Sequence, residues 1–142
     1  MILALDLSTV SGWALSDGTC GTFDFTDFKH DYGCMGMALF RELGEIFVTH
    51  DIDLVIIEQP FMRGRTTYHL FGLVFTAHMV ASTSDIPREM YTPQSIKKAV
   101  TGSIKATKDE VFSAVCALGY EPKNSHEADA LAIIEKWRMD NE

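Results

Sequence analysis

The sequence has 142 residues, of which 46% are hydrophobic and 23% are charged, a balance typical of one folded domain and unlike that of a disordered chain. Its apolar start is interrupted by Asp6 and resembles no signal peptide, and no apolar stretch is long enough to cross a bilayer. Three widely spaced cysteines disfavour both a disulfide framework and a structural zinc site. We therefore expect a single cytoplasmic domain over residues 1–142 that does not bind membranes.

The net charge of −8 is unfavourable for binding nucleic acid, but the charges are unevenly distributed. Between residues 62 and 108, seven basic residues accompany only two acidic ones, so this segment carries a charge of +5. Such segregation permits a basic face beside an acidic body, although scattered surface charge would give the same count. The basic residues are Arg63, Arg65, Arg88, Lys97, Lys98, Lys105 and Lys108.

The order of apolar runs and turn residues predicts an α/β fold. Strands are expected at residues 2–7, 12–15 and 21–25, with a turn at Asp17-Gly18, and these three should pair antiparallel. Helical spacing and continuous apolar runs then predict alternating elements. These are a helix at 35–50, a strand at 53–58, a helix at 66–82, a strand at 87–91, and helices at 93–100, 108–118 and 125–138. The result is a mixed central sheet flanked by helices.

Two acidic residues occupy positions where an apolar strand should carry no charge. Asp6 lies in the first predicted strand, and Glu58 ends the fourth. A carboxylate buried in an apolar strand is costly unless it is paired or binds a metal. If the two strands are neighbours, the side chains face each other at the carboxyl edge of the sheet, where ligands gather, and a cation would offset their repulsion. Alone, Asp6 could equally cap the turn that follows it.

A third acid, Asp129, lies in the last predicted helix, three residues after His126 and on the same helical face. The alanines on either side of Asp129 are small enough for this turn to lie close to the sheet. Asn124 and Glu127 have the spacing of an N-cap and its reciprocal acid, so we interpret Glu127 as a helix cap rather than a ligand. Taken alone, His126 would be interpreted as a partly buried polar residue.

Together these acids predict metal-dependent phosphodiester hydrolysis. Oxygen ligands from separated carboxylates suit Mg²⁺, or Mn²⁺ as a substitute, rather than zinc. Two such ions about 4 Å apart can activate water and stabilise the leaving oxygen. We expect Asp6 to bridge two Mg²⁺ ions and Glu58 and Asp129 to bind one each. His126 would ligate the second ion or orient the attacking water.

At this point the chain resembles the RuvC-type Holliday-junction resolvases, which have a ribonuclease-H-like fold. The resemblance includes LDLST at residues 5–9, IEQPF at 57–61, and HEADALA at 126–132. Its most specific part is the run TPQSIKKAVTG at 92–102, followed by ATK at 106–108. The first and last runs are shared widely among ribonuclease-H-like proteins, whereas the central block is more specific to the resolvases.

The resemblance implies a function for individual residues. Asp6, Glu58 and Asp129 fall on the metal-binding acids of the family, and His126 falls on its fourth site. Phe61 falls on an aromatic residue that stacks on a base near the junction. The family also has basic residues near the scissile phosphate, at the positions of Lys97 and Lys108. It further implies a homodimer that contacts its partner through the apolar helix after Glu58 and makes paired nicks in four-way DNA junctions.

The chain departs from the family pattern in being short and in carrying Arg63 and Arg65 in the segment expected to approach DNA. A compact phage-type or bacterial member would fit, and strict selectivity for junctions is open. One alternative is a nuclease of broad specificity for flaps, forks or hybrids. Another is a non-catalytic DNA-binding module, which the complete set of acids and lysines disfavours. An ATPase would need glycine-rich phosphate loops that the sequence does not have.

Overall fold

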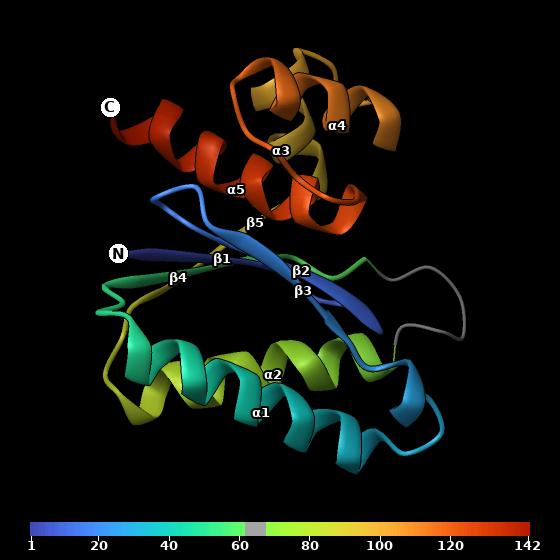
Figure 1. The fold of residues 1–142 in the computed structure, drawn as a ribbon, viewed down its shortest axis with the longest axis vertical. Coiled ribbons are helices and arrows are strands. Elements are labelled where there is room, and N and C mark those ends of the chain that lie inside the picture. The colour runs from blue at the N-terminus through green and yellow to red at the C-terminus, as the bar shows by residue number, and fades with distance from the viewer. Residues whose placement is uncertain (62–67) are drawn as a thin grey trace.

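A computed structural model describes residues 1–61 and 68–142, and over these ranges the chain forms a five-stranded sheet with helices on both faces (Figure 1). The strand order is β3-β2-β1-β4-β5. The strands are β1 (Ile2–Asp6), β2 (Val10–Leu15), β3 (Cys20–Asp24), β4 (Leu54–Glu58) and β5 (Arg88–Tyr91). The helices are α1 (Tyr32–Thr49), α2 (Tyr68–Thr83), α3 (Pro93–Thr101), α4 (Lys108–Ala117) and α5 (Ser125–Asn141), with a short 3-10 helix, η1, at Thr26–Phe28.

Strand β1 lies at the centre of the sheet. It pairs antiparallel with β2 and parallel with β4, and β4 pairs parallel with β5. The predicted antiparallel hairpin and the adjacency of the first and fourth strands are therefore confirmed. Because both faces of β1 are covered, its sequence reads as a nearly continuous apolar run.

The two faces of the sheet carry separate cores. Leu3 and Leu5 of β1 pack toward α1 and α2, whereas Ile2 and Ala4 pack toward α3, α4 and α5. This alternation is the ordinary two-residue period of a strand. It places Asp6, which has the same parity as Ala4, on the face that α5 covers.

Helix α1 begins earlier than the apolar periodicity predicts. Asp31 accepts a hydrogen bond from the backbone N–H of Cys34 and caps the helix at Tyr32. Residues 27–33 are polar and typical of a turn, but they contain the end of η1 and the start of α1. The first turn of α1 is largely exposed, so no apolar pattern marks it.

Helix α2 is apolar on nearly every side, a pattern that predicts burial against more than one surface. Leu73 and Val74 are indeed buried, but Phe71, Phe75 and Met79 are exposed on the opposite side. Within the described ranges, no helix combines the length and apolar character needed to span a membrane. Phe71, Phe75 and Met79 form an exposed apolar stripe along α2.

Gly12 of β2 allows α5 to lie directly on the sheet. A Cβ atom built on Gly12 would lie 1.8 Å from the carbonyl oxygen of His126, so only glycine fits at this position. Gly12 is also the register partner of Asp6. The first turn of α5 is thus held against the strand that pairs with the end of β1.

Candidate active site

The site begins at the carboxyl ends of two parallel strands. Asp6 is the last residue of β1 and Glu58 is the last residue of β4. Their predecessors Leu5 and Ile57 are register partners, so the two carboxylates leave the sheet side by side. The predicted juxtaposition of Asp6 and Glu58 is therefore found in the structure.

A cleft of about 360 Å³ opens at this edge, between the sheet and helices α3, α4 and α5. Acidic, basic, aromatic and aliphatic side chains contribute to it. Its lining residues are Asp6, Glu58, Phe61, Pro93, Gln94, Ile96, Lys97, Ile104, Lys108, Val111 and Asp129. Segments far apart in the sequence therefore bring all three predicted acids and two of the predicted lysines to one cavity.

Lys108 is the first residue of α4 and makes an ion pair with Asp129 of α5. Its Nζ lies 2.8 Å from Oδ2 of Asp129. Thr107 caps α4 by accepting a hydrogen bond from the backbone N–H of Glu110. This cap fixes the start of the helix, and hence the point from which Lys108 reaches into the cleft.

The carboxylates of the cleft are hard to ionise together. Burial raises the pKa of Asp6 to about 7, with repulsion from Asp129 adding to the effect and Lys108 opposing it. Burial likewise raises the pKa of Glu58 to about 8, aided by the charges of Asp6 and Asp129 and opposed by Lys108 and Lys97. Both pKa shifts indicate that the cleft holds too little positive charge to balance its carboxylates when all of them are ionised.

The same carboxylates favour the charged form of Lys108. Burial opposes its charged form, but the hydrogen bond with Asp129 and the charges of the three carboxylates together raise the pKa of Lys108 above its usual value. The ammonium group therefore stays protonated and acts as a built-in counter-ion for part of the acidic charge.

The donor chemistry of the cleft fits a divalent ion such as Mg²⁺. Its lining contains three carboxylates and no cysteine, and hard cations prefer such oxygen ligands. Across residues 1–61 and 68–142, however, no three acidic, histidine or cysteine side chains already lie close enough to form a ligand group. The ion pair with Lys108 engages one oxygen of Asp129, Oδ2.

His126 and Glu127 occupy different environments from the three acids. His126 does not belong to the described lining of the cleft. It is half-buried, and hydrogen bonds from Thr26 together with the charge of His126 lower the pKa of the Asp24 carboxyl. Its role as a fourth ligand stays a prediction.

Glu127 is buried and acts as the cap that the sequence predicts. Its backbone N–H donates to the side chain of Asn124 over 3.0 Å, and its carboxylate accepts from the backbone N–H of Lys123 at 2.7 Å. Thr22 and Cys20 of β3 also donate to the carboxylate. These contacts occupy both of its oxygens, which confirms the interpretation as a structural cap.

The residues expected to contact DNA divide into three groups. Phe61 and Lys97 line the cleft. Lys98 and Lys105 are exposed on the same part of the chain but outside the lining. Arg63 and Arg65 lie outside the described residues.

Gln94 and Ile104 also line the cleft, and sequence reasoning did not select them. Gln94 lies within the TPQSIKKAVTG block and Ile104 lies two residues after its end. This proximity is the sequence signal that could have identified them.

Comparison with known proteins places this site in a family. A family model described as crossover junction endodeoxyribonuclease RuvC matches residues 35–135, a range that includes Glu58, Lys108 and Asp129. The crossover junction endodeoxyribonuclease RuvC of Corynebacterium glutamicum is 32% identical over 112 residues, 72% of this chain and 49% of that protein. The RuvC of Pseudothermotoga lettingae is 30% identical over 140 residues, covering 93% of this chain and 84% of that protein.

Solved structures show the same fold. The Thermus thermophilus RuvC structure has a TM-score of 0.71 at 22% identity and covers 98% of this chain and 96% of that one. The T. thermophilus RuvC in complex with a Holliday junction substrate has a TM-score of 0.77 at 20% identity, covering 97% and 94% of the two chains. The predicted ribonuclease-H-like architecture is confirmed. This chain spans about half the length of the Corynebacterium relative. On the matched range and the whole-chain similarity, it belongs to the crossover junction endodeoxyribonuclease RuvC family.

Proposed function

We propose that this protein is a Mg²⁺-dependent endonuclease that resolves four-way DNA junctions by paired nicks. The observation that carries the proposal is the cleft in which Asp6, Glu58 and Asp129 meet two lysines at the carboxyl edge of the sheet. Membership of the RuvC family supports the substrate, because a family member has been seen bound to a Holliday junction.

The three carboxylates would hold two divalent ions, with His126 as a further ligand or a partner for water. Such ions, when bound, supply a nucleophilic hydroxide and stabilise the leaving oxygen. The raised pKa values of Asp6 and Glu58 support this assignment, since a cation would relieve the repulsion that produces them.

The basic and aromatic residues of the cleft would position DNA. Lys97 and Lys108 would offset the phosphate charge that develops during cleavage. Phe61 is 44% exposed at the mouth of the cleft, where it can stack on a base exposed at the branch point. Lys98 and Lys105 would contact the phosphate backbone farther out, together with Arg63 and Arg65.

We further propose a homodimer that forms through α2. Its exposed stripe of Phe71, Phe75 and Met79 is continuous with a groove that also contains Pro60 and Met90. Large apolar side chains gathered on a surface favour association with another protein surface. The sequence of α2 also suggests Leu70, Leu73 and Val74 for this interface, but Leu73 and Val74 are buried in the core of the same chain and Leu70 is half-buried. The proposed interface therefore consists of the exposed stripe. Two copies would present one cleft to each of two strands.

One gel assay tests the proposal. Wild-type protein is incubated in Mg²⁺ with a four-way junction, a fork, a flap, a linear duplex and an RNA–DNA hybrid. Paired symmetric nicks in the junction are expected, with little cleavage of the linear duplex. Comparable cleavage of the flap, fork and hybrid would instead indicate a broad-specificity nuclease, and no cleavage in Mg²⁺ or Mn²⁺ would indicate a non-catalytic binding module.

Point variants tie the activity to the cleft. Asp6→Asn, Glu58→Gln and Asp129→Asn should each abolish nicking, while DNA binding stays intact or becomes tighter because a negative charge near phosphate is removed. Asp109→Asn removes an exposed carboxylate from the first turn of α4 and serves as the matched control. Its cleavage rate should equal that of the wild type.

A further inference from the structure

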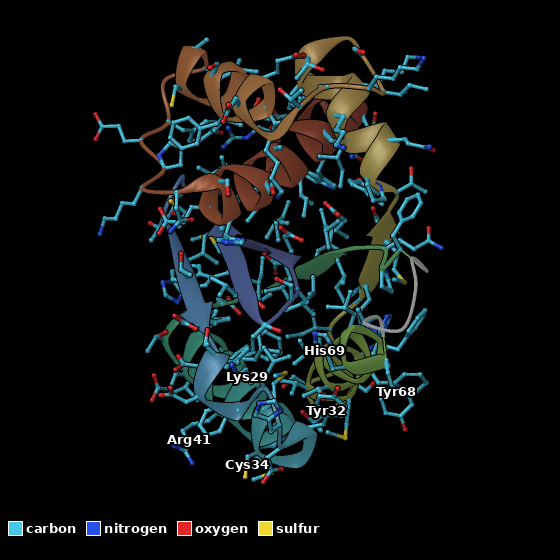
Figure 2. The ribbon with its side chains drawn as sticks, turned by 90° about the vertical axis from the view of Figure 1, so that its right-hand side faces the viewer. Lys29, Tyr32, Cys34, Arg41, Tyr68 and His69 are labelled. Carbon is cyan, nitrogen blue, oxygen red and sulfur yellow. The ribbon has the colours of Figure 1, made fainter. Side chains whose placement is uncertain are left out.

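Three aromatic rings meet on the face of the sheet opposite the cleft. Tyr32 opens α1, and Tyr68 and His69 open α2. The Tyr32 ring stacks on His69, with ring centroids 5.6 Å apart and planes 21° from parallel. The Tyr32 and Tyr68 rings lie 6.0 Å apart. Figure 2 shows the three side chains gathered where the two helices begin. We call Tyr32, Tyr68 and His69 the aromatic platform.

The platform is attached to the same end of the sheet as the catalytic acids. Nε2 of His69 lies 3.2 Å from Oγ1 of Thr9, in the turn that follows β1. Asp6 ends that strand three residues earlier. The cleft lies on the α5 side of this edge and the platform lies on the α1 and α2 side. A nucleic acid strand that crosses the edge can therefore contact both.

The platform leaves unusually large aromatic surfaces exposed. Tyr68 is 78% exposed and Tyr32 is 51% exposed. Two exposed tyrosines, one of them fixed by a histidine that is itself anchored to a threonine, form a preorganised stacking surface rather than a packed core. Aromatic rings bind bases by stacking, and this interaction accepts any base.

We propose that the aromatic platform binds an unpaired nucleobase of the DNA whose phosphate backbone occupies the cleft. This inference rests on the proposed nuclease function and adds a second base-contacting site on the opposite face from Phe61. The local charge favours stacking over phosphate binding, because the exposed residues just before Tyr32 include one lysine, Lys29, and two acids, Asp27 and Asp31. The platform should therefore contribute affinity that depends on bases and only weakly on salt.

Binding to single-stranded DNA in EDTA, where no cleavage occurs, tests the platform. The probes are a fluorescent twelve-residue oligothymidine and its counterpart in which the bases are replaced by abasic sites. Replacing both tyrosines (Tyr32→Leu with Tyr68→Leu) should weaken oligothymidine binding roughly tenfold or more and leave abasic binding unchanged. The paired Tyr→Phe changes retain the rings and should restore wild-type affinity. Phe47→Leu removes a half-buried ring in the last turn of α1, outside the groove that Tyr32 and His69 line, and is the matched control.

Three results would overturn the inference: unchanged affinity for oligothymidine, equal loss on both probes, or a leucine variant that binds weakly only because it sediments as a smaller species. The last would make Tyr68 a subunit contact, since it continues the exposed stripe of α2. The slope of affinity against salt should be the same in the leucine variant and the wild type. Junction cleavage by the wild type is measured separately, so the proposed function can stand even if the platform fails.

Discussion

Lys108 Nζ lies 2.8 Å from Oδ2 of Asp129, so the acidic cleft holds a cation that belongs to the protein itself. The same carboxylate is expected to bind a metal ion. On the proposed function, Lys108 and a bound Mg²⁺ ion would compete for this carboxylate. Lys108 would then be released toward the phosphate, where its charge is needed.

Lys108→Met separates these two roles. Without its counter-ion the acidic cluster should bind Mg²⁺ more tightly in the absence of DNA, as measured by calorimetry. Cleavage of junction DNA should fall by roughly tenfold or more, because a charge that stabilises the phosphate is lost. Lys136→Met, a lysine paired with Asp140 near the end of α5 and outside the cleft lining, should change neither quantity. Wild-type cleavage by Lys108→Met would remove Lys108 from the mechanism.

Asp6→Asn should stabilise the metal-free protein at alkaline pH. The pKa values of Asp6 and Glu58, about 7 and about 8 in the folded protein, lie above those of an unfolded chain. Folding is therefore favoured by these groups below about pH 4, and that contribution is lost as pH rises through 7 to 8. In EDTA at pH 8.5, Asp6→Asn should melt roughly 5 °C or more above the wild type, with little difference at pH 4.5.

Mg²⁺ provides the complementary measurement on the same two proteins. A cation bound between the carboxylates should raise the melting temperature of the wild type at pH 8.5 more than that of Asp6→Asn. Equal stabilisation of both proteins would mean that the ion binds elsewhere.

His126 tests how far the ligand set extends along α5. His126→Ala should lose most of the cleavage activity, whereas His126→Asp should retain much of it, because a carboxylate also binds Mg²⁺. Asp24→Asn is the matched variant, since Asp24 is the carboxylate whose pKa His126 helps to lower. If Asp24→Asn and His126→Ala lose activity equally, His126 acts by pairing with Asp24 and not at the metal.

Phe75→Glu should separate the proposed dimer. Phe75 is 76% exposed on the stripe of α2, and a charge there would be buried without a partner in an apolar interface. Sedimentation at micromolar concentration should show a dimer for the wild type and a monomer for Phe75→Glu. Val48→Glu alters a side chain that is 87% exposed on α1 and should leave the dimer intact. A monomeric wild type, with and without junction DNA, would refute the dimer.

Lys97→Ala should reduce the salt dependence of DNA affinity. A lysine that contacts a phosphate releases roughly one counter-ion on binding, so the logarithmic slope should decrease by about one unit. Lys136→Ala removes a lysine that is paired with Asp140 at the far end of α5 and should leave the slope unchanged. An unaltered slope in Lys97→Ala would place the DNA backbone on another surface.

The central sheet and the acid positions could be predicted because they depend on local signals. Asp6 and Glu58 interrupt apolar strands, and Asn124 and Glu127 have cap spacing that the structure confirms. The pairing of Lys108 with Asp129 joins residues 21 apart in sequence, and no local pattern encodes it. The exposed side of α2 could not be predicted either, because a helix that is apolar on all sides has no amphipathic pattern to identify the side facing solvent.

The geometry of the cleft depends on Gly12, a residue that does not line it. Since the first turn of α5 rests on the backbone of β2 at Gly12, the gap between Asp6 and Asp129 is set by the absence of one methyl group. The Cβ of an alanine at this position would push the first turn of α5 away from β2 and so move Asp129 away from Asp6. Every acid and lysine of the cleft would still be present. On the proposed function, cleavage would therefore depend on Gly12, which has no side chain with which to bind DNA or metal.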